Sequence, residues 1–328
     1  MNTFLDTDNR LFVLARRGKY LPNWLIAILM ALVFLFLSDL TFTPALFWLV
    51  GRLFPLYAWL NQLARSPYAL VSASELVLYL AIRFLPPVLL VWLWLRFVEQ
   101  RPFWTLGLER RGAALKYVRG FAFGFALFAL TTGILFITGA VIGIGGDPRS
   151  VGFGALGGVL LSYLGWALQG PSEEIVTRGW LLPILGARYK PGIGIVISSL
   201  LFGLFHALNT GFSLLALVNL ILFGLFAALY VLNDGSIWGM FGIHAAWNWA
   251  EGNVFGALVS GFNQPGGQLM ILHPVGPGWL TGAAFGPEGG LAVTATFLIG
   301  IAGMIWWGRR RQQQALPAVT WDVQGRRY

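Results

Sequence analysis

The chain has 328 residues, of which 57% are hydrophobic and only 11% are charged. Soluble globular proteins carry about 25% charged residues, so this chain has too few polar residues to cover the surface of a soluble protein of its length. The absence of cysteine excludes a disulfide framework, a thiolate metal site and a Cys nucleophile, and the net charge of +9 does not indicate nucleic acid, because the basic residues lie mostly between apolar segments.

Several apolar windows have the length of about 20 residues that a helix needs to cross a hydrocarbon core about 30 Å thick. Strand-type alternation is absent from these windows, so the backbone groups must be satisfied inside helices. The sequence therefore predicts an all-α fold, a polytopic transmembrane helical bundle of about eight spans. The predicted spans cover residues 22–42, 70–95, 118–144, 152–170, 192–209, 212–232, 236–256 and 288–307.

The N-terminal part contains two further features. The first apolar window follows a basic arm and is too long for a cleaved signal peptide, so we expect a retained signal anchor. Residues 44–66 are apolar but interrupted by Pro and Arg, which favours a re-entrant or interfacial segment. In the second span Glu75 and Arg83 lie about two turns apart, and we expect them to pair structurally with each other or with the membrane interface.

The distribution of Lys and Arg predicts the orientation. These residues are concentrated in the N-terminal arm, in the loop 96–119, in the connection around Arg188 and in the tail after residue 308, whereas residues 257–287 contain none. With eight spans, the four basic regions fall on the cytoplasmic side. We therefore expect an integral multi-pass protein of the bacterial plasma (inner) membrane with both termini in the cytoplasm.

The stretch "GPSEEIVTRGW" places two adjacent acids directly after a long apolar run. Gly170 and Pro171 interrupt regular helix geometry, so the acids lie either on a new helix or on a kinked continuation of the preceding span. Glu174 and Arg178 are four residues apart and can pair on one helical face. Glu173 is turned about 100° away, which leaves this carboxylate as a candidate general base. The alternative is that both acids favour a helix N-terminus through the helix dipole.

Two of the three histidines also lie inside predicted spans. In "SSLLFGLFHALN", His206 follows Phe202 by one turn, and in "GIHAAWNWAEG", His244 and Asn248 share a helical face to which Glu251 is close. Packed, hydrogen-bonded polar residues between helices are the alternative interpretation. The third histidine, His273, lies in a turn-rich stretch that we expect to be an outer loop without a role in the site.

Together these residues could carry out peptide hydrolysis. A carboxylate can activate water, imidazoles can hold the water or a metal, and an amide can donate to an oxyanion. A divalent metal such as Zn2+ is a candidate cofactor, with Glu173, His206 and His244 as candidate ligands, although the spacing is not that of the soluble HExxH zinc proteases.

The motifs "EEIVTR", "FGLFH" and "HAAWN" in this order resemble those of the CPBP intramembrane proteases, the family of CAAX prenyl proteases and bacteriocin-processing (Abi) proteins. The resemblance covers residues 100–256, with "RPFWTLGLERR" similar to the piece that precedes the family core. It implies three regions: 1–99 with the arm and the first two spans, 100–256 as the catalytic core, and 257–328 with the outer loop, the last span and the basic tail.

The resemblance also implies the roles of the site residues. Glu173 is the general base, Glu174 and Arg178 form its supporting pair, and His206 holds the water or a metal. His244 and Asn248 assist His206 and stabilise the oxyanion, and Phe202 shapes the wall beside His206 and the substrate.

The implied function is an intramembrane endopeptidase, metal- or glutamate-dependent, that cleaves a membrane-associated peptide or protein and contacts membrane lipid. Two other classes stay open: a non-enzymatic bacteriocin self-immunity protein or membrane chaperone, and a proton-coupled transporter. A transporter would place functional polar residues in both halves of the chain, whereas here they are concentrated between residues 173 and 251. The sequence does not identify the substrate or the oligomeric state.

Overall fold

The computed structural model describes residues 5–46, 48–49, 52 and 68–314. Over these ranges the chain is mainly helical, and its one two-stranded sheet pairs β1 (Val141–Ile144) with β2 (Ile271–Pro274) in antiparallel register. The predicted all-α bundle is therefore confirmed. The segment 44–66, predicted as re-entrant or interfacial, lies mostly outside the described residues.

Each of the eight predicted spans overlaps a helix. The main helices are α2 (Trp24–Leu32), which continues as the π-helical η1 (Val33–Phe42), α4 (Tyr68–Trp94), α5 (Ala113–Ile137), α6 (Leu156–Glu174), α7 (Leu182–Arg188), α8 (Pro191–Phe205), α9 (Leu214–Asp234), α10 (Trp238–Trp249) and α12 (Leu291–Gln314). The shorter elements are α1 (Arg10–Ala15), η2 (Leu95–Glu99), η3 (Phe103–Leu106), η4 (Phe153–Ala155), η5 (Ile175–Leu181), η6 (Ala250–Val254), α11 (Gly278–Thr281), η7 (Ala283–Phe285) and η8 (Pro287–Gly289).

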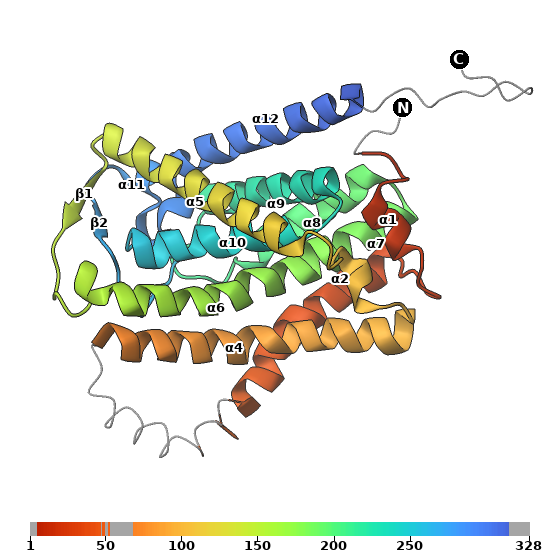
Figure 1. Cartoon of the computed structure of the whole chain (residues 1–328), viewed down its shortest axis with the longest axis horizontal. Coiled ribbons are helices and arrows are strands. Elements are labelled where there is room, and N and C mark those ends of the chain that lie inside the picture. The colour runs from red at the N-terminus through yellow and green to blue at the C-terminus, as the bar shows by residue number, and fades with distance from the viewer. Residues whose placement is uncertain (1–4, 47, 50–51, 53–67, 315–328) are drawn as a thin grey trace, which may run out of the picture.

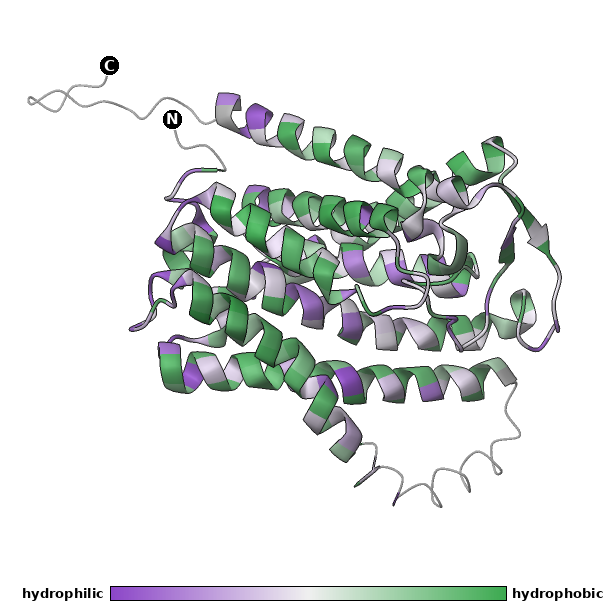
Figure 2. Ribbon diagram, turned by 180° about the vertical axis from the view of Figure 1, so that it is seen from behind, coloured by the Kyte–Doolittle hydropathy of each residue, from purple (hydrophilic) through white to green (hydrophobic). Residues whose placement is uncertain are grey.

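Five helices in the described part of the chain are long and apolar enough to cross a membrane, which makes this an integral membrane protein. They are Trp24–Leu46, Ala69–Glu99, Ala113–Ile137, Leu214–Asp234 and Leu291–Arg311. Hydrophobic residues cover most of their length (Figure 2). The predicted spans 152–170, 192–209 and 236–256 are not in this group, and the helix in the second of them, Pro191–Phe205, is apolar but shorter. The count of eight spans therefore stays a prediction.

The helices form a bundle in which α4 and α6 run side by side and α10 lies near the centre (Figure 1). α10 packs against both α5 and α6. α6 continues through η5 into α7 without a break, so the stretch 156–188 is one long helical element. The two elements that carry the predicted acids and the predicted His–Asn pair are therefore neighbours.

Two local predictions differ from the structure. The predicted span 118–144 is too long, because α5 ends at Ile137, Gly139 adopts a left-handed conformation with φ +66°, and the chain then forms β1. His273, expected in a loop, lies in β2 opposite Ile142, and it is exposed. The positive φ of Gly139 suits glycine and is typical of the residue that ends a helix.

Arg83, which was expected to pair with Glu75 or with the membrane interface, has other partners. Arg83 Nη2 donates to Asp39 Oδ2 at 3.0 Å and Nη1 donates to the Tyr79 hydroxyl at 3.0 Å, rather than to Glu75. Asp39 lies in η1, so the ion pair joins the first apolar helix to α4. Sequence spacing suggested Glu75 on the same helix as the ion-pair partner, whereas the packing of the helices supplies Asp39 from another helix.

Glycines allow α5 and α10 to approach each other closely. A Cβ atom at Gly120 would lie 1.9 Å from the Gly239 carbonyl oxygen, and one at Gly124 would lie 2.3 Å from the Ile243 oxygen. Gly120 and Gly124 are four residues apart, the spacing with which small residues bring membrane helices together. Because Ile243 precedes His244, this contact also sets the position of α10 in the site.

We expect Gly124→Ala to lower the stability of the bundle by about 1–3 kcal/mol, the usual cost of forcing an added methyl group into a packed interior. Thermal unfolding in detergent should show the loss, and peptide cleavage should fall as α10 moves. Gly133→Ala on the same helix is the control, because a Cβ at Gly133 meets nothing within 4 Å. Equal effects of the two substitutions would contradict this account of the α5–α10 contact.

Candidate functional site

The acids of "GPSEEIVTRGW" lie at the junction of α6 and η5. Pro171 lies inside α6, which continues past it, so the helix is the continuation of the preceding span rather than a new helix. The dipole of a helix N-terminus therefore does not explain the acids, because they lie within the continuous helical element 156–188, far from its N-terminus. Their side chains face neighbouring helices instead.

Glu174 is the centre of a buried ion pair. Its Oε1 accepts hydrogen bonds from Arg178 Nη1 at 3.1 Å and from His244 Nδ1 at 2.9 Å, and the Glu174 and Arg178 side chains are fully buried. The predicted i,i+4 pair is thus present. The Arg178 guanidinium also lies 4.4 Å from the ring centroid of Phe202, a cation–π contact. Through Glu174, this ion pair fixes the orientation of the His244 ring.

Glu173 lies beside the other nitrogen of the same imidazole ring. Its Oε1 accepts a hydrogen bond from Gln169 Nε2 at 2.8 Å, and its Oε2 lies 3.8 Å from His244 Nε2. Within the described residues this Oε2 is buried and has no hydrogen-bond partner. Glu173 therefore has one oxygen held by an amide and one buried oxygen without a partner, next to an imidazole nitrogen.

His206 lies one residue beyond the end of α8, as its C-terminal cap, rather than inside the helix as predicted. Its Nδ1 lies 2.9 Å from the Phe202 carbonyl oxygen. A carbonyl can only accept, so Nδ1 carries the hydrogen and the Nε2 of neutral His206 is an acceptor. The same argument applies to His244, whose Nδ1 contacts a carboxylate that already accepts from Arg178.

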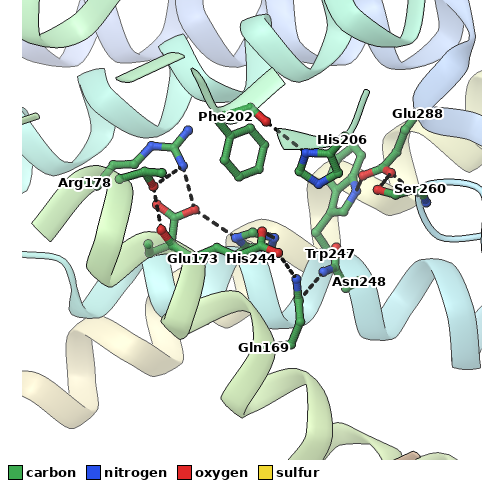
Figure 3. Close-up of polar contacts among 12 residues, drawn as sticks. Gln169, Glu173, Arg178, Phe202, His206, His244, Trp247, Asn248, Ser260 and Glu288 are labelled. Atoms are coloured by element: carbon green, nitrogen blue, oxygen red, sulfur yellow. Dashed lines mark hydrogen bonds and ion pairs between the residues drawn. The ribbon is translucent and has the colours of Figure 1, made fainter. Parts of the chain in front are cut away.

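One cavity of about 730 Å³ brings the predicted residues together. It extends between η1, α4, α6, α8 and α10 and reaches residues 259–265 and Glu288. Glu174 and Arg178 do not line it and lie behind its wall. Of the predicted site residues, those that line this cavity are Glu173, Phe202, His206, His244 and Asn248 (Figure 3).

Gln169 is a site residue that the sequence analysis missed. It lies one helical turn before Glu173, lines the cavity, and accepts a hydrogen bond from Asn248 Nδ2 at 2.7 Å. The i,i+4 spacing to Glu173 was a signal that could have identified it. Its contact with α10 could not be read from spacing.

Glu288, between α11 and α12, is a second missed residue of the cavity wall. Its Oε1 accepts from Trp247 Nε1 at 3.1 Å, and its Oε2 accepts from the Ser260 backbone N–H at 3.0 Å and hydroxyl at 2.5 Å. Ser260 has φ +47°, a strained conformation for a residue other than glycine. The Ser260 carbonyl accepts from Asn209 Nδ2, so Glu288 and Ser260 hold the loop after η6 against the turn that follows His206.

Glu251, considered above as a neighbour of His244 and Asn248, is fully buried and does not line the cavity. Its two carboxyl oxygens have no hydrogen-bond partner within the described residues. It lies in η6, where the chain has left the regular α-helical spacing on which the prediction depended.

The π-helical η5 is tied to the end of α4. Trp180 Nε1 donates to Glu99 Oε1 at 2.6 Å, and Arg101 Nε donates to Glu99 Oε2 at 2.5 Å, with all of these side chains buried. Arg101 belongs to the stretch "RPFWTLGLERR". This cluster holds η5, the segment that contains Arg178, in place.

The candidate metal ligands are not gathered into a metal site. Across residues 5–46 and 68–314, and at the described positions between them, no three His, Cys, Asp or Glu side chains are arranged to hold a metal ion. His206 Nδ1 and His244 Nδ1 are both engaged by protein oxygens. A metal-ligating histidine commonly makes such a contact through the ring nitrogen that does not bind the ion, so the Nε2 atoms of His206 and His244, with Glu173, would be the ligands of a metal bound here.

Residues 155–250 match the family model described as type II CAAX prenyl endopeptidase Rce1-like. The matched segment contains the three motifs completely and runs from the start of α6 to the end of α10. No curated protein and no solved structure matches the chain. The match agrees with the resemblance to the CPBP proteases and supports a CAAX-type protease, a hydrolase, at the level of the family.

Proposed function

We propose that this chain, an integral membrane protein of the Rce1-like type II CAAX prenyl endopeptidase family, hydrolyses a peptide bond of a membrane-associated peptide or protein with a water molecule that Glu173 activates. The observation that carries the proposal is the Glu173 carboxylate at the cavity wall. One of its oxygens is held by Gln169 and the other lies 3.8 Å from His244 Nε2. A separation beyond 3.5 Å suits a bridging water.

The surrounding groups support this role for Glu173. The Glu173 side chain is only 14% exposed, and electrostatic interactions in such a site are stronger than in water. Glu174 is already engaged by Arg178 and His244, so Glu173 is the carboxylate that is free to accept a proton. A general base must lie within hydrogen-bond reach of the water that it activates.

The reaction follows from these positions. The water oxygen bonds to the scissile carbonyl carbon while one water proton passes to Glu173 Oε2. The neutral Nε2 atoms of His206 and His244 are acceptors and orient the water through its second hydrogen. The Nδ2 group of Asn248 has a second hydrogen that can be donated to the oxyanion. The C–N bond then breaks and the proton on Glu173 passes to the leaving nitrogen.

The size of the cavity supports a peptide substrate. Its volume of about 730 Å³ is within the usual range of ligand pockets, roughly 300–1,000 Å³. Apolar residues of η1 and α4 contribute to its wall beside the polar residues. We propose that the substrate enters from within or near the membrane, and that the protein resides in a bacterial inner membrane with cytoplasmic termini.

The proposal is tested by reconstituting the purified protein in liposomes with a library of labelled membrane peptides. Cleavage at an internal bond supports the endopeptidase. A parent protein that leaves every peptide intact would favour the self-immunity or chaperone alternative, and proton flux coupled to uptake without cleavage would favour a transporter.

A chelator titration of the same liposomes tests the metal-independent route. We expect cleavage to persist after exhaustive chelation, because each proposed step uses protein side chains alone. Loss of cleavage that Zn2+ restores would overturn this route and assign a metal to the reaction.

A further inference from the structure

Gln169 connects the two helices that carry the proposed catalytic groups. Its Nε2 donates to Glu173 Oε1 at 2.8 Å on α6, and its Oε1 accepts from Asn248 Nδ2 at 2.7 Å on α10. Gln169 and Asn248 are 7% and 5% exposed, so neither hydrogen bond is replaced by bulk water. In Figure 3 Gln169 lies at the lower edge of the site, and dashed lines join its amide to Glu173 and to Asn248.

The charge of Glu173 determines the direction of both hydrogen bonds. An ionised carboxylate only accepts hydrogen bonds, so Gln169 must turn its NH2 group toward Glu173. The Gln169 carbonyl oxygen must then face Asn248, and Asn248 must turn its own NH2 group toward Gln169. One carboxylate thereby orients two amide side chains whose nitrogen and oxygen atoms could otherwise exchange places.

We propose that Gln169 is a positioning residue that couples the general base to the oxyanion donor. It holds Glu173 Oε1 and leaves Glu173 Oε2 beside His244 Nε2. It also holds one hydrogen of Asn248 Nδ2 and leaves the other for the oxyanion. This inference rests on the proposed function, and it names a residue outside the three motifs.

A simpler role for Gln169 would be to join α6 and α10, since amide side chains often link helices in membranes. The two roles differ in what they change. A helix-joining contact affects stability, whereas a positioning contact affects kcat, because small misplacements of catalytic groups cost about 100-fold in rate.

The experiment therefore measures kcat, KM and thermal unfolding of Gln169→Met, a side chain of similar length that makes neither hydrogen bond. We expect kcat to fall by about 10- to 100-fold while KM stays within about twofold of the parent value, since the bulk of the cavity wall is kept. The matched control is Ser172→Ala. Ser172 is buried on α6 and donates to the Phe84 carbonyl on α4 at 2.7 Å, away from Glu173.

Substitutions at Asn248 test whether the orientation of the Gln169 amide links Asn248 to Glu173. In Asn248→Asp the new carboxylate competes for the Gln169 NH2 group, and Gln169 would then turn its oxygen toward Glu173. We expect Asn248→Asp to be more damaging than Asn248→Ala in the parent. We expect this difference to shrink in the Gln169→Met background, where only the repulsion between the new carboxylate and the oxyanion remains. A difference that persists unchanged without Gln169 would overturn the coupling.

The outcomes separate the two proposals. If the parent cleaves no peptide, the proposed function fails. If the parent cleaves, Glu173→Gln does not, and Gln169→Met keeps the kcat of the parent, then only the positioning role of Gln169 fails. A fall in kcat equal to that of Ser172→Ala, with equal losses of thermal stability, would assign Gln169 to helix packing alone.

Discussion

Glu173→Gln is expected to lower kcat by about 10²- to 10⁴-fold, the usual contribution of a general base. The substitution keeps the shape of the side chain, and its amide oxygen can still accept the hydrogen bond from Gln169. Its NH2 group cannot take a proton from water. Because the side chain only borders the cavity, folding should be retained, and purified variant and parent can be compared by single-turnover cleavage of one labelled peptide.

Glu251→Gln is the matched control for this variant. It makes the same chemical change at another buried acid, one that does not line the cavity. We expect Glu251→Gln to keep the kcat of the parent. Cleavage at the rate of the parent by Glu173→Gln, or equal losses in both variants, would refute the assignment of Glu173 as the base.

Arg178→Met is expected to destabilise the fold by about 3–5 kcal/mol, the cost of breaking a buried ion pair by removing one partner. Glu174 would keep its contact with His244 but lose its guanidinium partner in a fully buried position. The contact between the guanidinium and the Phe202 ring would be lost as well. Thermal unfolding in detergent micelles measures the effect.

The double variant Glu174→Gln with Arg178→Met tests the cause. Removing both charges leaves no uncompensated buried ion, so we expect most of the stability to return. Cleavage should stay low, because the carboxylate that orients His244 is gone. If Arg178→Met unfolds no earlier than the double variant, the buried charge is not the source of the instability.

The helices could be predicted because the membrane imposes a length and an apolar composition on each. The apolar windows at 22–42 and 212–232 are therefore close to the helical stretches Trp24–Leu46 and Leu214–Asp234. The end of α5 could not be predicted in this way. Residues 138–144 are as apolar as a span, but Gly139 turns the chain out of the helix into β1.

Within the site, the contacts along one helix could be predicted and those between helices could not. The spacing of Glu174 and Arg178 predicted their ion pair, and the spacing of His244 and Asn248 placed both on the cavity wall. The contact of His244 with Glu174 joins residues 70 positions apart. Only the packing of α6 against α10, which depends on glycines and side-chain shapes across the bundle, creates it.

The same limit applies to Gln169 and Glu288. Gln169 lies four residues before Glu173, yet a Gln in an apolar helix has many partners available, and Asn248 was not the evident one. Glu288 lies in "FGPEGG", where nothing in the local pattern points to Ser260 or Trp247. The family motifs identified residues that share the cavity, and the structure adds the side chains that hold them.

The most direct measurement is single-turnover cleavage of a labelled membrane peptide by the reconstituted protein in water enriched in ¹⁸O, with the products weighed by mass spectrometry. The parent should release two fragments and place one ¹⁸O atom in the new carboxyl group, and Glu173→Gln should leave the peptide intact. Intact peptide with the parent protein, or fragments without ¹⁸O, would contradict hydrolysis by a water molecule that Glu173 activates.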